Sequence, residues 1–262
     1  MTALALAAGD SATMLRRNLR HALRYPSMTL STIGMPVVVL LLFTYAYGGA
    51  LGAGIGGIAA GGDYIDYVAP GVILMAATSG AVATAVAVCS DMTEGIMGRF
   101  RTMAISRTSV LTGHVLGSVI QAMLSVAIVI GVALLVGFRP TAGVGAWLAT
   151  VGFLVVVTFA LVWLSVALGQ VSKTVEAASN VGMPLVLLPF LGSGFVPTDS
   201  MPAGLRWFAE YQPFTPIIET LRGLLMGTPI GNNAWIALGW CALITLGGYL
   251  WSKKLFNREY SR

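Results

Sequence analysis

The stretch VAPGVILMAATSGAVATAVAVC, residues 68–89, decides the fold, because it is almost entirely apolar and contains no charged side chain. A helix needs about 20 apolar residues to cross the hydrocarbon core of a bilayer. Outward from it, similar runs occupy residues 30–51, 110–138 (apart from His114) and 144–168, and two shorter runs occupy residues 181–196 and 235–251. The sequence therefore predicts six membrane-spanning helices.

The composition supports the same fold class. Of the 262 residues, 56% are hydrophobic and only 10% are charged, whereas a soluble domain carries about 25% charged residues. No soluble insert separates the apolar runs, so residues 1–262 are predicted to form one membrane domain. Cys89 and Cys241 lie inside apolar runs and outside any CxxC pattern, which favours buried thiols over a disulfide or a metal site.

The distribution of Lys and Arg predicts the orientation. Six spans put both termini on one side, and with that side cytoplasmic, twelve Lys and Arg lie inside and three outside. The three outside are Arg139, Arg206 and Arg222. This excess follows the positive-inside rule and predicts cytoplasmic termini in the cytoplasmic membrane. It also explains the basic net charge without nucleic acid as a partner.

Residues 11–25 are predicted to form an interfacial helix before the first span. On a helix, its leucines and arginines fall on neighbouring stripes: Leu15, Leu19 and Leu23 beside Arg16, Arg20 and Arg24. Such a helix lies in the headgroup layer, with leucines toward the acyl chains and arginines toward anionic lipid. The alternative is a soluble basic helix.

Several kinds of chemistry lack their residues. No GxxxxGK[ST] pattern occurs, so the chain cannot form its own P-loop for ATP. The GxGxxG at Gly52, Gly54 and Gly57 follows a predicted span rather than a strand, so it is not a dinucleotide fingerprint. His21 and His114 have no acidic or cysteine neighbours at metal-ligand spacing. We therefore expect no catalytic residue, metal or cofactor in this chain.

Residues 91–106 form a charged connection between the second and third predicted spans. Its acidic residues come first and its arginines later, an order that complements the dipole of a helix. Apolar residues recur beside the basic face at helical spacing, namely Ile96, Phe100 and Met103. A short amphipathic helix of this kind can rest on lipid or fit a groove on a cytoplasmic protein, and these residues leave both open.

Two stretches resemble one family. Residues 94–117, EGIMGRFRTMAISRTSVLTGHVLG, and residues 192–225, GSGFVPTDSMPAGLRWFAEYQPFTPIIETLRGLL, resemble ABC-2 type permeases, in particular membrane subunits of the daunorubicin/doxorubicin resistance exporter family. Both stretches stand in the order and at the topological positions that they have in that family. The resemblance therefore covers essentially the whole chain.

The resemblance implies a role for residues 91–106. In such permeases this connection is the coupling helix that docks on the nucleotide-binding subunit. By that resemblance, five residues face the ATPase: Glu94, Gly95, Arg99, Phe100 and Arg101. Charged groups would orient such a contact and apolar side chains would anchor it.

The region after the fifth predicted span is irregular. Pro184 and Pro189 are expected to interrupt that span, and residues 192–194 to end it. Residues 199–226 then contain two short helices, at 205–211 and 216–226, which by resemblance are extracellular and dip back toward the membrane. The alternative is an ordinary outer loop. Within the second helix, Glu219 and Arg222 can pair at i and i+3.

These observations predict an all-α polytopic membrane protein that works as the permease subunit of an ATP-driven ABC exporter. The expected cargo is a hydrophobic or amphipathic compound such as a drug, natural product or lipid. The expected partners are an ABC ATPase that carries ATP and Mg, a second permease subunit (identical or paralogous) and membrane lipid. The alternatives are export of a lipid-linked saccharide or other envelope component, and a non-transporting membrane anchor or sensor for the ATPase.

Overall fold

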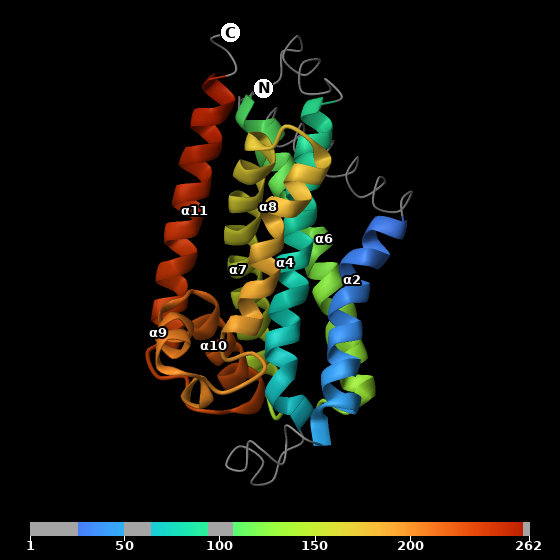
Figure 1. Ribbon diagram of the computed structural model, residues 1–262, viewed down its shortest axis with the longest axis vertical. Coiled ribbons are helices and arrows are strands. Elements are labelled where there is room, and N and C mark those ends of the chain that lie inside the picture. Colours follow the sequence, from blue (N-terminus) through green and yellow to red (C-terminus); the bar gives the residue numbers. More distant parts are fainter. Residues whose placement is uncertain (1–25, 50–63, 94–106, 259–262) are drawn as a thin grey trace.

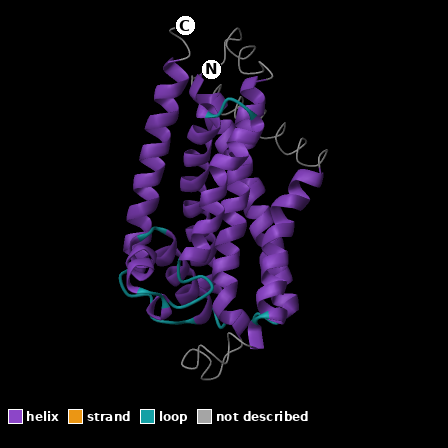
Figure 2. Cartoon of the chain, viewed as in Figure 1, coloured by secondary structure: helices purple, strands orange, loops and turns teal. Residues whose placement is uncertain are grey.

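The structure, a computed structural model, describes residues 26–49, 64–93 and 107–258. Within these ranges the regular structure is helical throughout, with eight α-helices, short 3-10 and π turns, and no strand (Figure 2). This confirms the all-helical fold class. The predicted interfacial helix, at 11–25, lies outside the described residues.

Six helices of the bundle run alternately in opposite directions (Figure 1). They are α2 (Pro26–Leu41), α4 (Tyr64–Thr93), α6 (Arg107–Val136), α7 (Val144–Val171), α8 (Val175–Leu187) and α11 (Asn233–Arg258). In the view of Figure 1, α2, α6 and α8 descend, whereas α4, α7 and α11 ascend. We call the upper end of this bundle the Lys173 end and the lower end the Arg222 end, after basic residues found there.

Four of these helices are long and apolar enough to cross a membrane. They are α4, α7, the part of α6 from Val115 to Val136 and the part of α11 from Asn233 to Leu255. Two shorter apolar helical segments, Thr32–Ala46 and Val175–Leu191, correspond to the first and fifth predicted spans. The six predicted spans thus correspond in order to six helices, and that all six cross a membrane stays a prediction.

The fifth predicted span differs most from its helix. It was expected at 181–196, but α8 begins at Val175, because the Thr174 side chain accepts a hydrogen bond from the Ala177 N–H at 3.1 Å and caps the helix. The prediction that Pro184 interrupts the span is wrong, since α8 continues to Leu187 and only then tightens into a 3-10 turn. Because Pro184 has no N–H, the Asn180 carbonyl has no hydrogen-bond donor within the helix. Asn180 is an exposed residue rather than a buried core residue, so the helix tolerates this loss.

Helix α4 is the central element of the bundle. It contacts α2, α6, α7, α8 and α10, and 72% of its most apolar stretch is buried, against 17% for α11. Small residues permit this close approach. A Cβ built on Gly80 would lie 2.7 Å from the Cβ of Ala122 on α6, and one built on Gly169 of α7 would lie 2.5 Å from the Ala85 carbonyl oxygen.

Helix α11 stands at one side of the bundle and packs mainly on α7 (Figure 1). The backbone of Gly248 approaches Trp163, whose ring meets that of Tyr249 edge to face at 5.1 Å between centroids. Most of the remaining surface of α11 is apolar and exposed, including Leu243, Leu246 and Leu250. Such a face is suited to lipid rather than to water.

Candidate functional site at the two ends of the bundle

The residues predicted to face an ATPase lie outside the described part of the chain. These are Glu94, Gly95, Arg99, Phe100 and Arg101, and their role stays a prediction. The flanking residues Thr93, which ends α4, and Arg107, which begins α6, lie at the Lys173 end (Figure 1). A protein that contacts residues 94–106 would therefore act directly on the end of α4 and the start of α6.

At the Lys173 end, α4 is held against the turn that joins α7 to α8. The Cys89 thiol donates a hydrogen bond to the Ser172 carbonyl at 3.4 Å, and the Thr93 hydroxyl donates to the Cys89 carbonyl at 3.0 Å. The turn also presents the exposed charge of Lys173, and the first turn of α8 presents that of Glu176. The end of α4 is therefore supported on one side by a capped, charged turn.

At the Arg222 end, two short helices follow α8. They are α9 (Ala203–Tyr211) and α10 (Phe214–Met226), which confirms the two predicted helices, each starting two residues earlier than expected. Helix α10 buries Ile217, Leu221 and Leu225 in the core. It ends at Gly227, whose φ of +72° is the left-handed conformation that favours glycine at this position.

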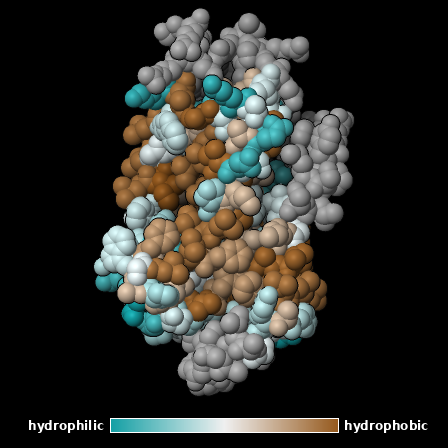
Figure 3. Space-filling view, viewed as in Figure 1, coloured by the Kyte–Doolittle hydropathy of each residue, from teal (hydrophilic) through white to brown (hydrophobic). Residues whose placement is uncertain are grey.

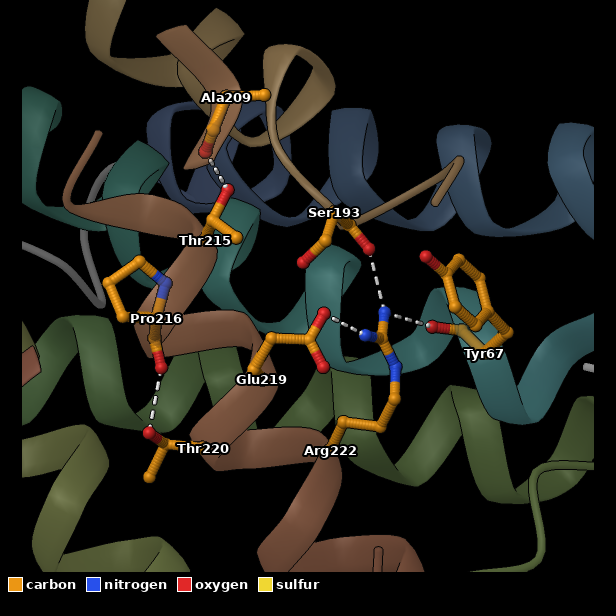
Figure 4. Close-up of polar contacts among 8 residues, drawn as sticks. All are labelled: Tyr67, Ser193, Ala209, Thr215, Pro216, Glu219, Thr220 and Arg222. Carbon is orange, nitrogen blue, oxygen red and sulfur yellow. Dashed lines mark hydrogen bonds and ion pairs between the residues drawn. The ribbon is translucent and has the colours of Figure 1, made fainter. Parts of the chain in front are cut away.

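A buried arginine joins three segments at this end. Arg222 is only 8% exposed. One of its terminal nitrogens donates to the Ser193 carbonyl at 2.7 Å and to the Tyr67 carbonyl at 3.2 Å, and the other binds the Glu219 carboxylate (Figure 4). Its guanidinium carbon also lies 3.9 Å from the centre of the Tyr67 ring. The predicted Glu219–Arg222 pair is confirmed. The two carbonyl contacts of Arg222 bind α10 to α4 and to the turn after α8.

The turn after α8 is held by α4 and α2 as well. The Tyr64 hydroxyl donates to the Phe195 carbonyl at 2.9 Å. The Phe195 ring stacks on Phe190 at 4.3 Å and lies 4.6 Å from Phe43, which is in the π turn after α2. This turn is therefore a fixed part of the bundle rather than a free loop.

Sequence reasoning missed most of the partners of Arg222. The i, i+3 spacing indicates Glu219, but Tyr67 lies 155 residues away and Ser193 lies 29 residues away. Both accept through backbone carbonyls, which every residue carries, so the residue types leave no signal for these contacts. Only the absence of another carboxylate near Arg222 in the sequence could have suggested backbone partners.

The Arg222 cluster is suited to holding segments together. The Glu219 carboxylate neutralises the guanidinium, and the two carbonyls occupy further donors, so the charge is compensated inside the fold. Within the described ranges no group of three or more His, Cys, Asp or Glu side chains is placed to hold a metal ion.

The long apolar helices, with the short helices α9 and α10 at one end, define the class as a polytopic helical membrane protein. The chain belongs to the ABC-2 type transporter family, whose model matches residues 11–226. That match includes residues 91–106 as well as α9 and α10. The family resemblance inferred from residues 94–117 and 192–225 is thereby confirmed.

Similar proteins include drug-resistance permeases. The chain is 29% identical over 228 residues to the daunorubicin resistance ABC transporter permease protein DrrB1 of Streptomyces coeruleorubidus, covering 86% of this chain and 78% of that protein. It is 23% identical over 175 residues to the probable doxorubicin resistance permease DrrC of Mycobacterium tuberculosis, covering 67% of this chain and 63% of that protein. A match of 24% to ABC transporter G family member 20 of Dictyostelium discoideum covers 62% of this chain but only 22% of that protein.

Proposed function

We propose that this chain is the permease subunit of an ATP-driven ABC exporter that moves a hydrophobic or amphipathic compound out across the cytoplasmic membrane. The observation that carries the proposal is the family match over residues 11–226. Two drug-resistance permeases among the similar proteins support the export role. Because the sequence contains no P-loop, ATP and Mg belong to a separate ABC ATPase subunit.

In this proposal residues 91–106 dock on the ATPase and α4 carries the movement. Helix α4 has 30 residues, so it is about 45 Å long at 1.5 Å per residue. Its last three residues, 91–93, belong to the predicted coupling segment, and its first turn holds Arg222 through Tyr67. A displacement of one end of a packed helix reaches the other end, because tightly packed interiors are not continuously deformable.

A second permease subunit would complete the pathway. The first half of α8 exposes Ser179 and Asn180. Hydrophilic surface also lies over the upper part of the bundle in Figure 3. Polar side chains on a membrane helix face protein or a water-filled space rather than lipid. This exposed polar side of α8 supports a neighbouring permease, or the pathway itself, on that face.

The proposed orientation places the Lys173 end in the cytoplasm, together with both termini. Lys173, Lys253 and Lys254 lie toward that end, whereas Arg139, Arg206 and Arg222 lie toward the other. This distribution supports the positive-inside assignment. Helices α9 and α10 are then extracellular.

Reconstitution tests the proposal and its alternatives. The purified chain in vesicles, with and without its ATPase subunit, is supplied with ATP and a fluorescent anthracycline. We expect ATP hydrolysis and anthracycline movement only when both subunits are present. Hydrolysis by the homogeneous chain alone would contradict the division between subunits. Movement of a lipid-linked saccharide but not the anthracycline would favour the envelope alternative, and no vectorial movement of any cargo would favour the anchor or sensor.

A further inference from the structure

The first two turns of α4 lie directly against the turn after α8, residues 192–197. The Tyr64 hydroxyl donates a hydrogen bond to the Phe195 carbonyl at 2.9 Å. Two helical turns further on, a Cβ built on Gly71 would lie 2.8 Å from both the Cα and the carbonyl oxygen of Gly194, so the two backbones are in contact. Backbones packed this closely do not shift independently. A movement of this end of α4 therefore carries the turn with it.

Arg222 extends this connection to α10. One terminal nitrogen of its guanidinium donates to the Tyr67 carbonyl of α4 at 3.2 Å and to the Ser193 carbonyl of the turn at 2.7 Å. In Figure 4 the side chain rises from α10, and its guanidinium lies between Glu219 and Tyr67, next to Ser193. A single group thus fixes the position of α10 relative to both α4 and the turn.

This arrangement requires a guanidinium and not merely a positive charge. The planar fork holds Glu219 with one terminal nitrogen and the two carbonyls with the other. Lysine keeps the charge, but it carries one compact ammonium on a flexible stem. It can compensate Glu219 without holding both carbonyls in one fixed geometry. The substitution Arg222→Lys therefore separates charge compensation from the connection between segments.

We propose that Arg222 is the positioning residue through which a movement of α4 reaches α10. Its guanidinium geometry carries this role, and its pairing with Glu219 makes the buried charge tolerable. The inference rests on the proposed function, in which a separate ATPase acts on the opposite end of α4. It adds that the response of α10 to the ATPase depends on one side chain.

Hydrogen exchange tests this dependence without requiring a known cargo. The full chain with its ATPase subunit, in lipid nanodiscs, is compared in the nucleotide-free state and after trapping with MgATP and vanadate. Mass spectrometry follows deuterium uptake in the last turn of α4 and in α10, because exchange of backbone amides reports local opening in each segment. ATP hydrolysis is measured on the same complexes.

Arg206→Lys is the matched control. Arg206 lies at the same end of the bundle, but its guanidinium pairs with Asp199 and Glu210, and all three side chains are exposed. Neither of these partners belongs to α4.

We expect trapping to change uptake in both segments of the unsubstituted chain and of Arg206→Lys. In Arg222→Lys the change at the end of α4 should persist and ATP hydrolysis should continue, while the change in α10 is lost. This regional loss separates a positioning role from a merely structural one, which would weaken both responses and ATP hydrolysis together.

An undiminished response of α10 in Arg222→Lys would overturn the proposal, as would parallel loss of both responses and of ATP hydrolysis. Failure of the unsubstituted chain to bind an ATPase would instead contradict the proposed function and remove the basis of this inference with it. If Arg222→Lys does not yield folded protein, the double variant Glu219→Gln/Arg222→Gln replaces it, because it removes both charges and leaves neither buried without a partner. The same outcomes then decide.

Discussion

At the scale of single residues, Arg222 and Glu219 illustrate how a buried charge is tolerated in a largely apolar chain. The guanidinium has a carboxylate, two backbone carbonyls and an aromatic face as neighbours. An uncompensated buried charge is costly, and removing one partner leaves the other with its full desolvation penalty. The stability of the Arg222 end should therefore depend on Glu219 more than on any exposed carboxylate nearby.

Replacement of Glu219 by Gln tests this dependence. Glu219→Gln should destabilise the protein by about 1–3 kcal/mol, the usual cost of leaving a buried charged donor without its partner. We expect a value in the lower part of this range, because the Glu219 side chain is 31% exposed and water partly replaces it. The measurement is the midpoint of thermal unfolding in lipid nanodiscs.

Glu210→Gln is the matched control, since Glu210 also pairs with an arginine but both partners are exposed. It should change the stability by no more than about 0.5 kcal/mol. Equal effects of the two substitutions would mean that burial does not govern the Arg222 contact.

The sequence predicted side-chain contacts only between residues that lie a few positions apart in the chain. It indicated the Glu219–Arg222 pair from spacing alone, and the structure contains it. It could not indicate that Arg222 reaches the Tyr67 and Ser193 carbonyls, because backbone acceptors are identical at every position. Contacts of this kind depend on how distant segments pack.

At the scale of helices, α4 and α7 illustrate how small residues set the distance between neighbours. Gly169 on α7 lies against the backbone of Ala85, and a Cβ added there would be 2.5 Å from the Ala85 carbonyl oxygen. Side chains can shift to relieve such overlap, whereas backbone atoms within two packed helices move only if the helices separate.

Gly169→Ala should therefore weaken the α4–α7 contact, although alanine is the better helix former. We expect a loss of about 1–3 kcal/mol, the usual cost of overpacking a tight interior. Gly152→Ala on the same helix is the control, because no atom lies within 4 Å of its added Cβ. It should be neutral or slightly stabilising. Chemical denaturation in detergent would measure the free energy of unfolding of both variants. A Gly169→Ala variant as stable as the unsubstituted chain would contradict the close packing.

Hydropathy predicted the order of the long helices but misplaced several ends. The apolar run of the fifth span starts near Val181, yet α8 starts at Val175 because Thr174 supplies the cap. Likewise, α11 continues to Arg258, past the end of the predicted apolar run at residue 251. Apolar runs mark where lipid could lie, whereas helix ends are set by capping groups and solvated side chains, so the two boundaries do not coincide.

At the scale of the whole molecule, the alternating directions of the long helices predict which residues face each side of the membrane. Gly231 lies just before α11 at the Arg222 end, and exposed Lys173 lies at the opposite end. A cysteine at position 231 should react with a membrane-impermeant maleimide added to intact cells, and one at position 173 should react only after lysis. The reverse pattern would invert the proposed orientation.

In the proposed function, a separate ATPase drives this permease through residues 91–106. Reversal of the charge at Glu94 separates docking on a protein from contact with lipid. Against a complementary protein surface, Glu94→Lys places like charges together, which costs several kcal/mol. Beside anionic headgroups, the new lysine would be harmless or slightly favourable. Glu210→Lys, at the opposite end of the bundle, is the matched charge reversal that should leave the ATPase contact intact.

The decisive measurement is co-purification of the ATPase with each variant from membranes, together with ATP-dependent transport by the reconstituted complex. We expect that Glu94→Lys reaches the membrane in normal amounts but loses both the ATPase and transport, while Glu210→Lys retains both. A Glu94→Lys variant that binds the ATPase and transports at the rate of the unsubstituted chain would contradict docking of residues 91–106 on the ATPase.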